Sequence, residues 1–240
     1  MLRKDPPENL DWCAHFKALA LALSSIDPQL QSFYQQGCIP SDTPLAEVPF
    51  VAVDFETTGL DAKHDEIVSI GLVPFDLSRI RMREARHWLL KPRRKLASES
   101  VVIHGITHSD IDDAPDLEEV LGAVLEAIGG RIPVVHYRYI ERPFLDAALK
   151  RRVNEGIQFP VVDTMELESR MHRQGFTRKL SRFLGRKPVS IRLSDSRVRY
   201  SLPRYSQHHA LTDAIATAEL LQAQIRHHYS EDTPISELWC

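Results

Sequence analysis

The sequence predicts an α/β fold in which a mixed β-sheet of about five strands is flanked by helices. Three short apolar runs follow one another at residues 49–57, 66–75 and 84–92, with turn-prone residues between them. Such a series is typical of a meander of strands. From Asp116 onward, segments with helical spacing alternate with short extended runs, as they do where helices connect the strands of a sheet. The 240 residues, 43% of them hydrophobic, suit a globular domain with a sizeable core.

The first 49 residues are predicted to form an N-terminal helical extension and a linker. One helical face is indicated by apolar residues at Trp12, Phe16, Leu19 and Leu23. The pair Asp27 and Pro28 is expected to divide this segment into two helices, and Gly37 to end the second. Three prolines shortly before residue 50 are typical of a connector. The expected division of the chain is extension, main domain and short tail, at 1–49, 50–230 and 231–240.

Helices and strands alternate through the second half of the main domain. Asp116 is expected to cap a helix that ends at Gly129. The expected elements after it are a strand at 132–137, a helix at 143–153, a strand leading into a helix within 159–167, and a final helix at 211–228.

Composition argues against several classes of protein. The three cysteines are widely spaced and lack a C-x-x-C pair, which argues against a disulfide framework or a thiolate zinc site and favours reduced thiols in the cytoplasm. No apolar run approaches the roughly 18 residues that a membrane span needs. Acidic residues precede the apolar run at 18–26, whereas a secretory signal begins with basic ones. The net charge of −3 leaves nucleic acid open as a partner.

Two acidic residues, Asp54 and Glu56, interrupt an apolar run that is predicted to be a strand. Side chains alternate along a strand, so both carboxylates point the same way, about 7 Å apart. Like charges on an apolar strand repel each other and are costly to bury. A divalent cation would remove that cost; the alternative is an edge strand whose acids face water. The tight turn that follows, at Thr57, Thr58 and Gly59, could offer N–H groups and hydroxyls to a phosphate or a sugar.

A second candidate lies where the last helix is expected to begin. His208 precedes this helix, and Asp213 lies within it. Carboxylates bind hard cations and histidine titrates near neutral pH, so the pair could serve a metal site or a proton transfer. Taken alone, a helix that opens with His and Asp is commonplace and is more typical of a solvated helix start.

Together, these two features resemble motifs of a known family. The stretch VDFETTGL and the His-x-x-x-x-Asp pattern at His208 and Asp213 are similar to motifs one and three of the DEDDh exonucleases. This family includes the proofreading epsilon subunit of bacterial DNA polymerase III, ribonuclease T and exonuclease X. The stretches IHGIT (103–107) and VVDT (161–164) also lie where the family carries similar ones. The resemblance spans residues 50–228 and implies a ribonuclease H-like fold.

Motif two of the family is a His-Asn-x-x-Phe-Asp pattern after the fourth strand. In this chain the matching residues run from His136 to Glu141, with Tyr137 in place of the asparagine. Glu141 is therefore expected to be the site carboxylate, and Asp146, further along the helix, a surface residue. The change from Asp to Glu favours an altered metal preference or substrate choice, with loss of activity as the alternative.

The resemblance implies hydrolysis of phosphodiester bonds from a 3′ end with two Mg²⁺ or Mn²⁺ ions. In the family's pattern Asp54 bridges the ions. Glu56 and Asp213 hold the ion beside the attacking water, and Glu141 supports the other. His208 corresponds to the general base. The terminal nucleotide would be held by residues after motif one and by a histidine further on, here Thr57, Thr58, Leu60 and His104.

Single-stranded nucleic acid is the expected partner. Between residues 178 and 204 the chain has nine Arg or Lys and one acidic residue, together with Phe183 and Tyr200. Basic residues interleaved with aromatic ones suit backbone contact and base stacking. The basic run at 91–95 could add phosphate contacts. The alternative for both runs is an ordinary solvated surface.

Two other functions also fit the sequence. One is a nucleic-acid-binding module of the same fold that has lost catalysis through Glu141, and the other is a nuclease restricted to very short oligonucleotides. Eleven residues follow Tyr229, which favours a stand-alone or differently recruited exonuclease over a proofreading subunit tethered by a long tail. The N-terminal helices could pack on the domain, bind a protein partner or form a homodimer, and these roles stay open.

Overall fold

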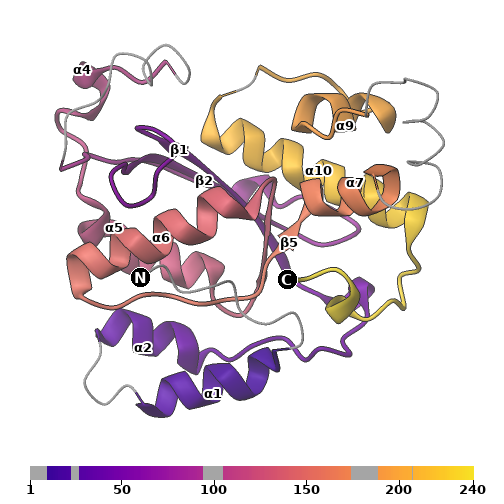
Figure 1. The fold of residues 1–240 in the computed structure, drawn as a ribbon, viewed down its shortest axis with the longest axis horizontal. Coiled ribbons are helices and arrows are strands. Elements are labelled where there is room, and N and C mark those ends of the chain that lie inside the picture. The colour runs from indigo at the N-terminus through magenta and orange to yellow at the C-terminus, as the bar shows by residue number, and fades with distance from the viewer. Residues whose placement is uncertain (1–9, 23–26, 94–104, 174–188, 207) are drawn as a thin grey trace.

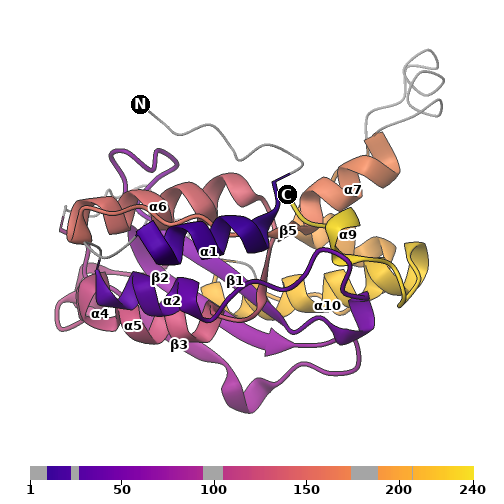
Figure 2. The same cartoon turned by 90° about the horizontal axis from the view of Figure 1, so that it is seen from below.

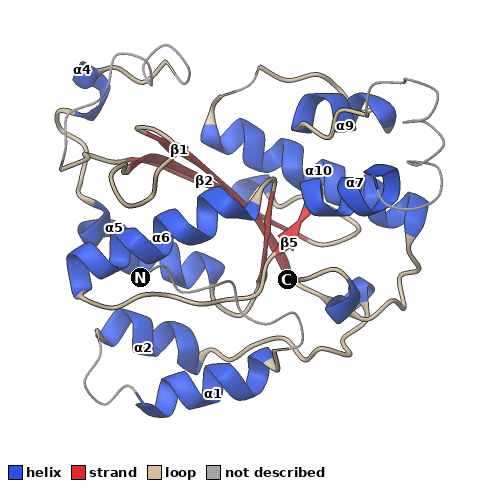
Figure 3. Ribbon diagram, viewed as in Figure 1, coloured by secondary structure: helices blue, strands red, loops and turns tan. Residues whose placement is uncertain are grey.

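The computed structural model describes residues 10–22, 27–93, 105–173, 189–206 and 208–240. Its five strands are β1 (Phe50–Thr57), β2 (Ile67–Phe75), β3 (Arg86–Leu89), β4 (Ile132–Val135) and β5 (Val162–Asp163). They form one sheet in the order β3-β2-β1-β4-β5. The pairs β1–β2 and β2–β3 are antiparallel, and the pairs β1–β4 and β4–β5 are parallel. The predicted mixed sheet is therefore confirmed (Figure 3).

The described helices are α1 (Trp12–Ala22), α2 (Pro28–Gln35), α4 (His108–Ile111), α5 (Leu117–Ile128), α6 (Arg138–Val153), α7 (Thr164–Arg173), α9 (Leu193–Arg199) and α10 (Ala210–His228). Short 3-10 turns are η1 (Leu45–Glu47), η2 (Met82–Glu84) and η3 (Ile235–Glu237). Helices flank the sheet on both faces (Figures 1 and 2). Within the described part of the chain, no helix combines the length and the apolar character that crossing a membrane requires.

The side chains of β1 alternate between two apolar cores. Val53 belongs to the core that includes residues of α1, α2, α5 and α6, whereas its neighbour Ala52 packs with α10. This alternation follows from the two-residue period of a strand. Asp54 and Glu56 continue the series of Ala52 and therefore lie on the α10 side of the sheet.

Local signals set several helix ends where the sequence predicted them. The carboxylate of Asp27 caps α2, and Pro28 is the first residue of that helix. Asp116 caps α5 through a capping box, and Gly129 ends the helix. Of the apolar face predicted for the first helix, Leu23 lies outside the described residues.

α6 begins at Arg138, earlier than predicted. The prediction began this helix at Pro143, a residue type that is common at the first helical position, but Pro143 lies inside the helix. The start depends on Asp163 at the end of β5, whose carboxylate accepts hydrogen bonds from the backbone N–H groups of Tyr137 and Arg138 at 3.1 and 3.0 Å. The first N–H groups of a helix have no partner within it. A tertiary contact therefore decides where α6 begins.

The N-terminal helices and the C-terminal residues pack against the main domain. Phe16 of α1 meets Phe33 and Tyr34 of α2, with ring centroids 5.6 and 5.1 Å apart. The backbone of Cys240 exchanges hydrogen bonds with that of Val161, at 2.9 and 3.2 Å. In Figure 1, α1 and α2 lie at the lower edge of the molecule and α9 at the upper right. The boundaries after residues 49 and 230 stay a prediction, since the two cores extend across them.

Candidate active site

Three carboxylates from two elements meet beside the C-terminal half of β1. Asp54 and Glu56 belong to β1, and Asp213 lies in the first turn of α10. One oxygen from each of them lies within 4.8 Å of the other two. Glu56 and Asp213 are largely buried, at 8% and 9% exposed. Hard oxygen ligands at this spacing fit a divalent cation.

The N-terminus of α10 reaches these acids because β2 carries a glycine at the point of contact. Gly71 is the residue that pairs with Asp54 in the register of β1 and β2. A Cβ atom at Gly71 would lie 2.2 Å from the carbonyl carbon of Ala210 and from the nitrogen of Leu211. Any other residue would therefore displace the start of α10 from the sheet, and Asp213 with it.

Glu141, the predicted fourth carboxylate, lies in the first turn of α6, outside the three-residue cluster. It is 3% exposed, and its Oε2 atom has no hydrogen-bond partner among the described residues. Burial is the largest cause that raises the pKa of Asp54, and the negative charge of Glu141 is the next. Glu141 therefore interacts electrostatically with the cluster. Asp146 instead accepts hydrogen bonds from Lys150 and from the backbone N–H of Ile157.

Burial raises the pKa values of the acids of the site, and neighbouring carboxylates add to the shifts of Asp54 and Glu56. Burial, and then the other three carboxylates, raise the pKa of Asp54 well above its usual value. Burial and the charge of Asp213 raise the pKa of Glu56 to about 7. Burial raises the pKa of Glu141 to about 8, and it also raises the pKa of Asp213. The fold thus holds four acids together against desolvation and mutual repulsion, a cost that a divalent cation would remove.

His208 lies just before α10 in a left-handed backbone conformation, with φ of 67°. Its backbone N–H donates a hydrogen bond to Oδ2 of Asp213 at 2.8 Å, which orients that carboxylate. The side chain is exposed and lines, with Glu56, a pocket of about 230 Å³. His87 and His209 line the same pocket, with ring centroids 4.8 Å apart. His208 therefore lies within the same site as the acids.

The turn after β1 contains the predicted nucleotide-binding residues. Thr57 donates its hydroxyl to the carbonyl of Gly59 at 2.6 Å. Thr58 donates to a carboxylate within the same turn at 3.2 Å. Leu60 is 85% exposed, so its side chain is open to contact with a ligand. His104 lies outside the described residues.

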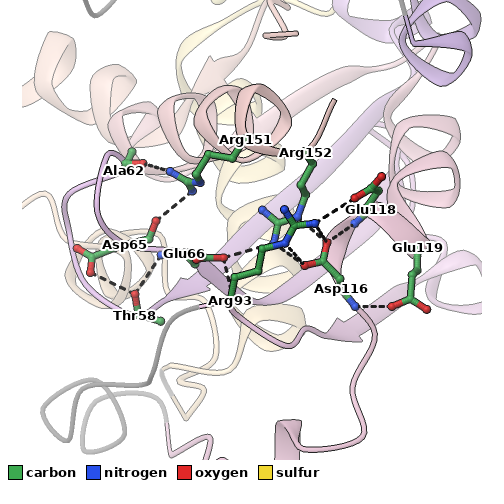
Figure 4. A network of polar contacts seen from close by, with 10 residues as sticks. All are labelled: Thr58, Ala62, Asp65, Glu66, Arg93, Asp116, Glu118, Glu119, Arg151 and Arg152. Atoms are coloured by element: carbon green, nitrogen blue, oxygen red, sulfur yellow. Dashed lines mark hydrogen bonds and ion pairs between the residues drawn. The ribbon is translucent and has the colours of Figure 1, made fainter. Parts of the chain in front are cut away.

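A network of ion pairs and hydrogen bonds holds this turn against α5 and α6 (Figure 4). The buried side chain of Arg152 contacts the carboxylates of Glu66 and Asp116, at 3.3 and 2.6 Å. Arg151 donates to two backbone carbonyls of the turn, at 2.9 and 3.2 Å. The end of α6 that lies away from Glu141 therefore fixes the turn that contains Thr57 and Thr58.

The basic run at 178–204 is only partly a surface feature. Its first eleven residues lie outside the described residues. Arg197 is buried and paired with Glu219 of α10, at 2.6 Å. Arg199 is paired with Glu168, a fully buried residue of α7. These two arginines stabilise the packing of α9, so they are not the solvent-facing phosphate ligands that the sequence indicated.

Comparison with known proteins decides the family. The model of a family described as exonuclease (RNase_T) matches residues 51–221. The chain belongs to this exonuclease family. It is 31% identical to the PolC-type DNA polymerase III of Bacillus subtilis (strain 168) over 76% of the chain, which spans 12% of that polymerase. The DNA polymerase III epsilon subunit of Treponema pallidum (strain Nichols) is 29% identical over 77% of the chain and 80% of its own length.

The fold of this chain agrees with that of a solved structure. The nuclease domain of 3′hExo, a DEDDh family member bound to rAMP, matches it with a TM-score of 0.59 at 14% identity. The match covers 75% of this chain and 92% of that one. The DEDDh-type resemblance and the ribonuclease H-like fold are therefore confirmed.

Two residues position the candidate site without having been predicted to do so. Asp163 sets the start of α6 and hence the place of Glu141. An acid at the end of a strand, directly before a helix, is a capping signal that could have identified it. Gly71 lets α10 approach the sheet. A glycine inside an apolar strand is a known sign of close backbone approach.

Proposed function

We propose that this protein is a metal-dependent 3′–5′ exonuclease that hydrolyses single-stranded DNA or RNA to nucleoside 5′-monophosphates. One observation carries the proposal: Asp54, Glu56 and Asp213 each offer an oxygen within 4.8 Å of the others. The buried Glu141 adds a fourth carboxylate, one oxygen of which has no partner among the described residues. Membership of the exonuclease family supports the phosphodiester bond as the target.

Two Mg²⁺ or Mn²⁺ ions would be held by the four acids of the site, Asp54, Glu56, Asp213 and Glu141. Bound ions of this kind supply charge stabilisation to the attacking and leaving oxygens of a phosphodiester. Hard carboxylate oxygens suit these ions better than they suit softer metals. Carboxylates bind metals in their ionised form. Those acids whose pKa values are raised by burial would therefore release protons when metal binds.

His208 is the proposed general base. An imidazole nitrogen takes a proton from the attacking water, and the water oxygen forms a bond to phosphorus. The bond between phosphorus and the 3′ oxygen of the preceding nucleotide breaks, and that oxygen takes up a proton from solvent. The products are a nucleoside 5′-monophosphate and a strand with a new 3′-hydroxyl group. The exposure of His208 in the pocket that Glu56 lines supports this role.

The terminal nucleotide is proposed to bind at the turn after β1. Thr57 and Thr58 shape the turn, and the exposed Leu60 offers an apolar surface to the nucleoside. His104 would complete this contact. The monophosphate bound to the solved nuclease domain of 3′hExo, rAMP, is of the same chemical class as the proposed product.

Digestion of 5′-labelled single-stranded DNA and RNA with Mg²⁺ or Mn²⁺ tests the proposal. We expect a ladder that shortens from the 3′ end, and we expect it to disappear in EDTA and in Asp54→Ala. Loss of a metal ligand should lower the rate more than about 100-fold, because changes around metal ligands already cost about 10–100-fold. The matched control is Asp146→Asn, which changes an acid of α6 that bonds outside the cluster and should leave the rate within about twofold.

Two results would favour the alternatives. A strand that shifts in a gel in a salt-sensitive way, but is never shortened, would indicate a binding module that has lost catalysis through Glu141. Cleavage of dinucleotides without cleavage of longer strands would indicate a nuclease of very short oligonucleotides. Products that lack a 5′-phosphate, or a ladder from the 5′ end, would contradict the proposed direction.

A further inference from the structure

Two exposed tyrosines stand at the N-terminal end of α6. Tyr137 is 43% exposed and Tyr139 is 46% exposed, although tyrosine usually buries much of its ring. Their ring centroids lie 5.3 Å apart at an angle of 60°. Neither residue belongs to the apolar cores described above. The pair therefore forms a small aromatic surface that packing within the fold does not explain.

The backbone at Tyr137 is held in a costly conformation. Its φ and ψ angles are 103° and 77°, in the left-handed half of backbone space. Residues other than glycine rarely adopt such a conformation, and aspartate and asparagine tolerate it better than tyrosine does. The carboxylate of Asp163 holds this conformation by accepting the backbone N–H of Tyr137. Strain of this kind is concentrated at functional sites, so a tyrosine here points to a use for its ring.

The aromatic pair lies beside the acids of the site. β4 runs parallel to β1 with Val134 opposite Ala52, so the chain leaves the sheet toward Tyr137 at the level of Asp54 on the neighbouring strand. Glu141 in turn lies close enough to Asp54 for its charge to raise the pKa of that residue, after burial. A strand whose last phosphodiester reaches the carboxylates would therefore come near the rings.

Arg138 gives the pair a positive charge and a fixed geometry. Its guanidinium lies 4.7 Å from the ring centroid of Tyr139 and donates a hydrogen bond to the hydroxyl of that ring at 3.0 Å. The side chain of Arg138 also reaches Asp163 at 3.5 Å. Aromatic rings beside an arginine are the combination by which proteins bind single strands without sequence preference.

We propose that Tyr137 and Tyr139 form a stacking platform for bases of the substrate strand, upstream of the nucleotide that is removed. This inference rests on the proposed function. It adds base stacking as a contact with the substrate, at residues that lie outside motifs one and three. Every base has an aromatic face, so the platform accepts any sequence. Arg138 fixes the ring of Tyr139 and offers its charge to the phosphate backbone.

Binding of a 5′-fluorescein-labelled oligonucleotide, measured by anisotropy in EDTA, tests the platform without catalysis. We expect Tyr137→Asn and Tyr139→Leu each to raise the Kd about fivefold or more, as loss of one stacked base does. Asparagine tolerates the left-handed conformation, so Tyr137→Asn should melt at the same or a higher temperature than the wild type. The control is Met82→Ala, which removes a 53% exposed side chain from η2 and should leave the Kd unchanged.

Single abasic positions in the same oligonucleotide identify the stacked base. We expect the wild type to lose affinity when one or two positions near the 3′ end lack a base, and Tyr137→Asn to lose nothing further at those positions. Equal losses in both proteins, or an unchanged Kd in both tyrosine variants, would overturn the platform. If the wild type cleaves and binds while the variants behave like it, the proposed function stands without the platform. If the wild type neither cleaves nor binds, the proposed function itself fails.

Discussion

At the scale of single residues, the site depends on small groups that let charged ones come together. Asp54 and Asp213 belong to elements far apart in the sequence, and burial raises the pKa of each, with the charges of other acids adding to the shift of Asp54. They meet because Gly71 has no side chain at the crossing of β2 and α10. The residue that determines the geometry of the site is thus an apolar glycine that holds neither metal nor substrate.

The replacement Gly71→Ala tests this dependence. The added Cβ would overlap the backbone at Ala210, and relief of such overpacking typically costs about 1–3 kcal/mol. We expect a lower melting temperature and, because Asp213 moves with α10, a loss of nuclease activity that exceeds the loss of folded protein. The test is to measure nuclease activity and, by circular dichroism, the folded fraction of each protein, and to compare the activity per folded molecule.

Gly122→Ala is the matched control. A Cβ at Gly122 of α5 would meet only the flexible end of Gln29, at 3.1 Å. Alanine is favoured over glycine inside a helix by about 1 kcal/mol, so this variant should be as stable as the wild type or more so, with unchanged activity. Equal behaviour of the two variants would contradict the role given to Gly71.

At the scale of elements, α6 connects the site to the rest of the fold at both of its ends. Its first turn places Glu141, at a position set by Asp163. Its last turns contain Arg151 and Arg152, which hold the turn after β1 (Figure 4). The helix therefore links a proposed metal-binding acid to the proposed nucleotide-binding turn, so that both share one rigid support.

Arg152→Met should damage this support. Removal of one partner of a buried ion pair typically costs about 3–5 kcal/mol, because the other charge stays buried, and Arg152 serves both Glu66 and Asp116. We expect a lower midpoint in urea and, in the folded enzyme, a KM for oligonucleotide that rises more than kcat falls. The control is Arg93→Gln, whose side chain is 50% exposed and whose ion pairs should contribute less than about 1 kcal/mol. A larger effect of Arg93→Gln than of Arg152→Met would refute the assignment.

At the scale of the whole molecule, the clustered acids make stability depend on pH when no metal is present. The pKa of Glu56 is raised to about 7 and that of Glu141 to about 8 by burial, with Asp213 adding to the shift of Glu56. In an unfolded chain each of these carboxyl groups has a pKa near 4.5. Above that pH the folded state therefore holds more protons than the unfolded state. The contribution of these two groups to the free energy of unfolding is therefore fully present below about pH 4.5, and it is lost as the pH rises through 7 and 8.

A melting temperature that falls between pH 6.5 and 8 in EDTA is the expected result. The lower limit avoids His136, whose pKa burial lowers to about 4, which makes stability rise with pH in a lower range. Mn²⁺ should raise the melting temperature most at pH 8, because it binds the ionised acids. Glu141→Gln should flatten the pH dependence. A melting temperature that rises over this range in the absence of metal would show that the acids are not mutually destabilising.

Much of this protein could be predicted from local pattern. The alternation of apolar residues along β1 placed Asp54 and Glu56 on one face, and capping residues such as Asp116 marked helix ends. These features depend on backbone period and on hydrogen bonds between near neighbours, which a sequence displays directly. The spacing of His208 and Asp213 around a helix start is of the same kind.

Other features were decided only by the tertiary structure. The start of α6 depends on Asp163, and the approach of α10 depends on Gly71, each through contact with a distant part of the chain. The same is true of the basic run, where Arg197 and Arg199 proved to be internal ion-pair partners. The charge and spacing of residues are written in the sequence. Whether a charge meets solvent, metal or a buried partner depends on which distant element packs against it, and packing brings that element into place only when the chain folds.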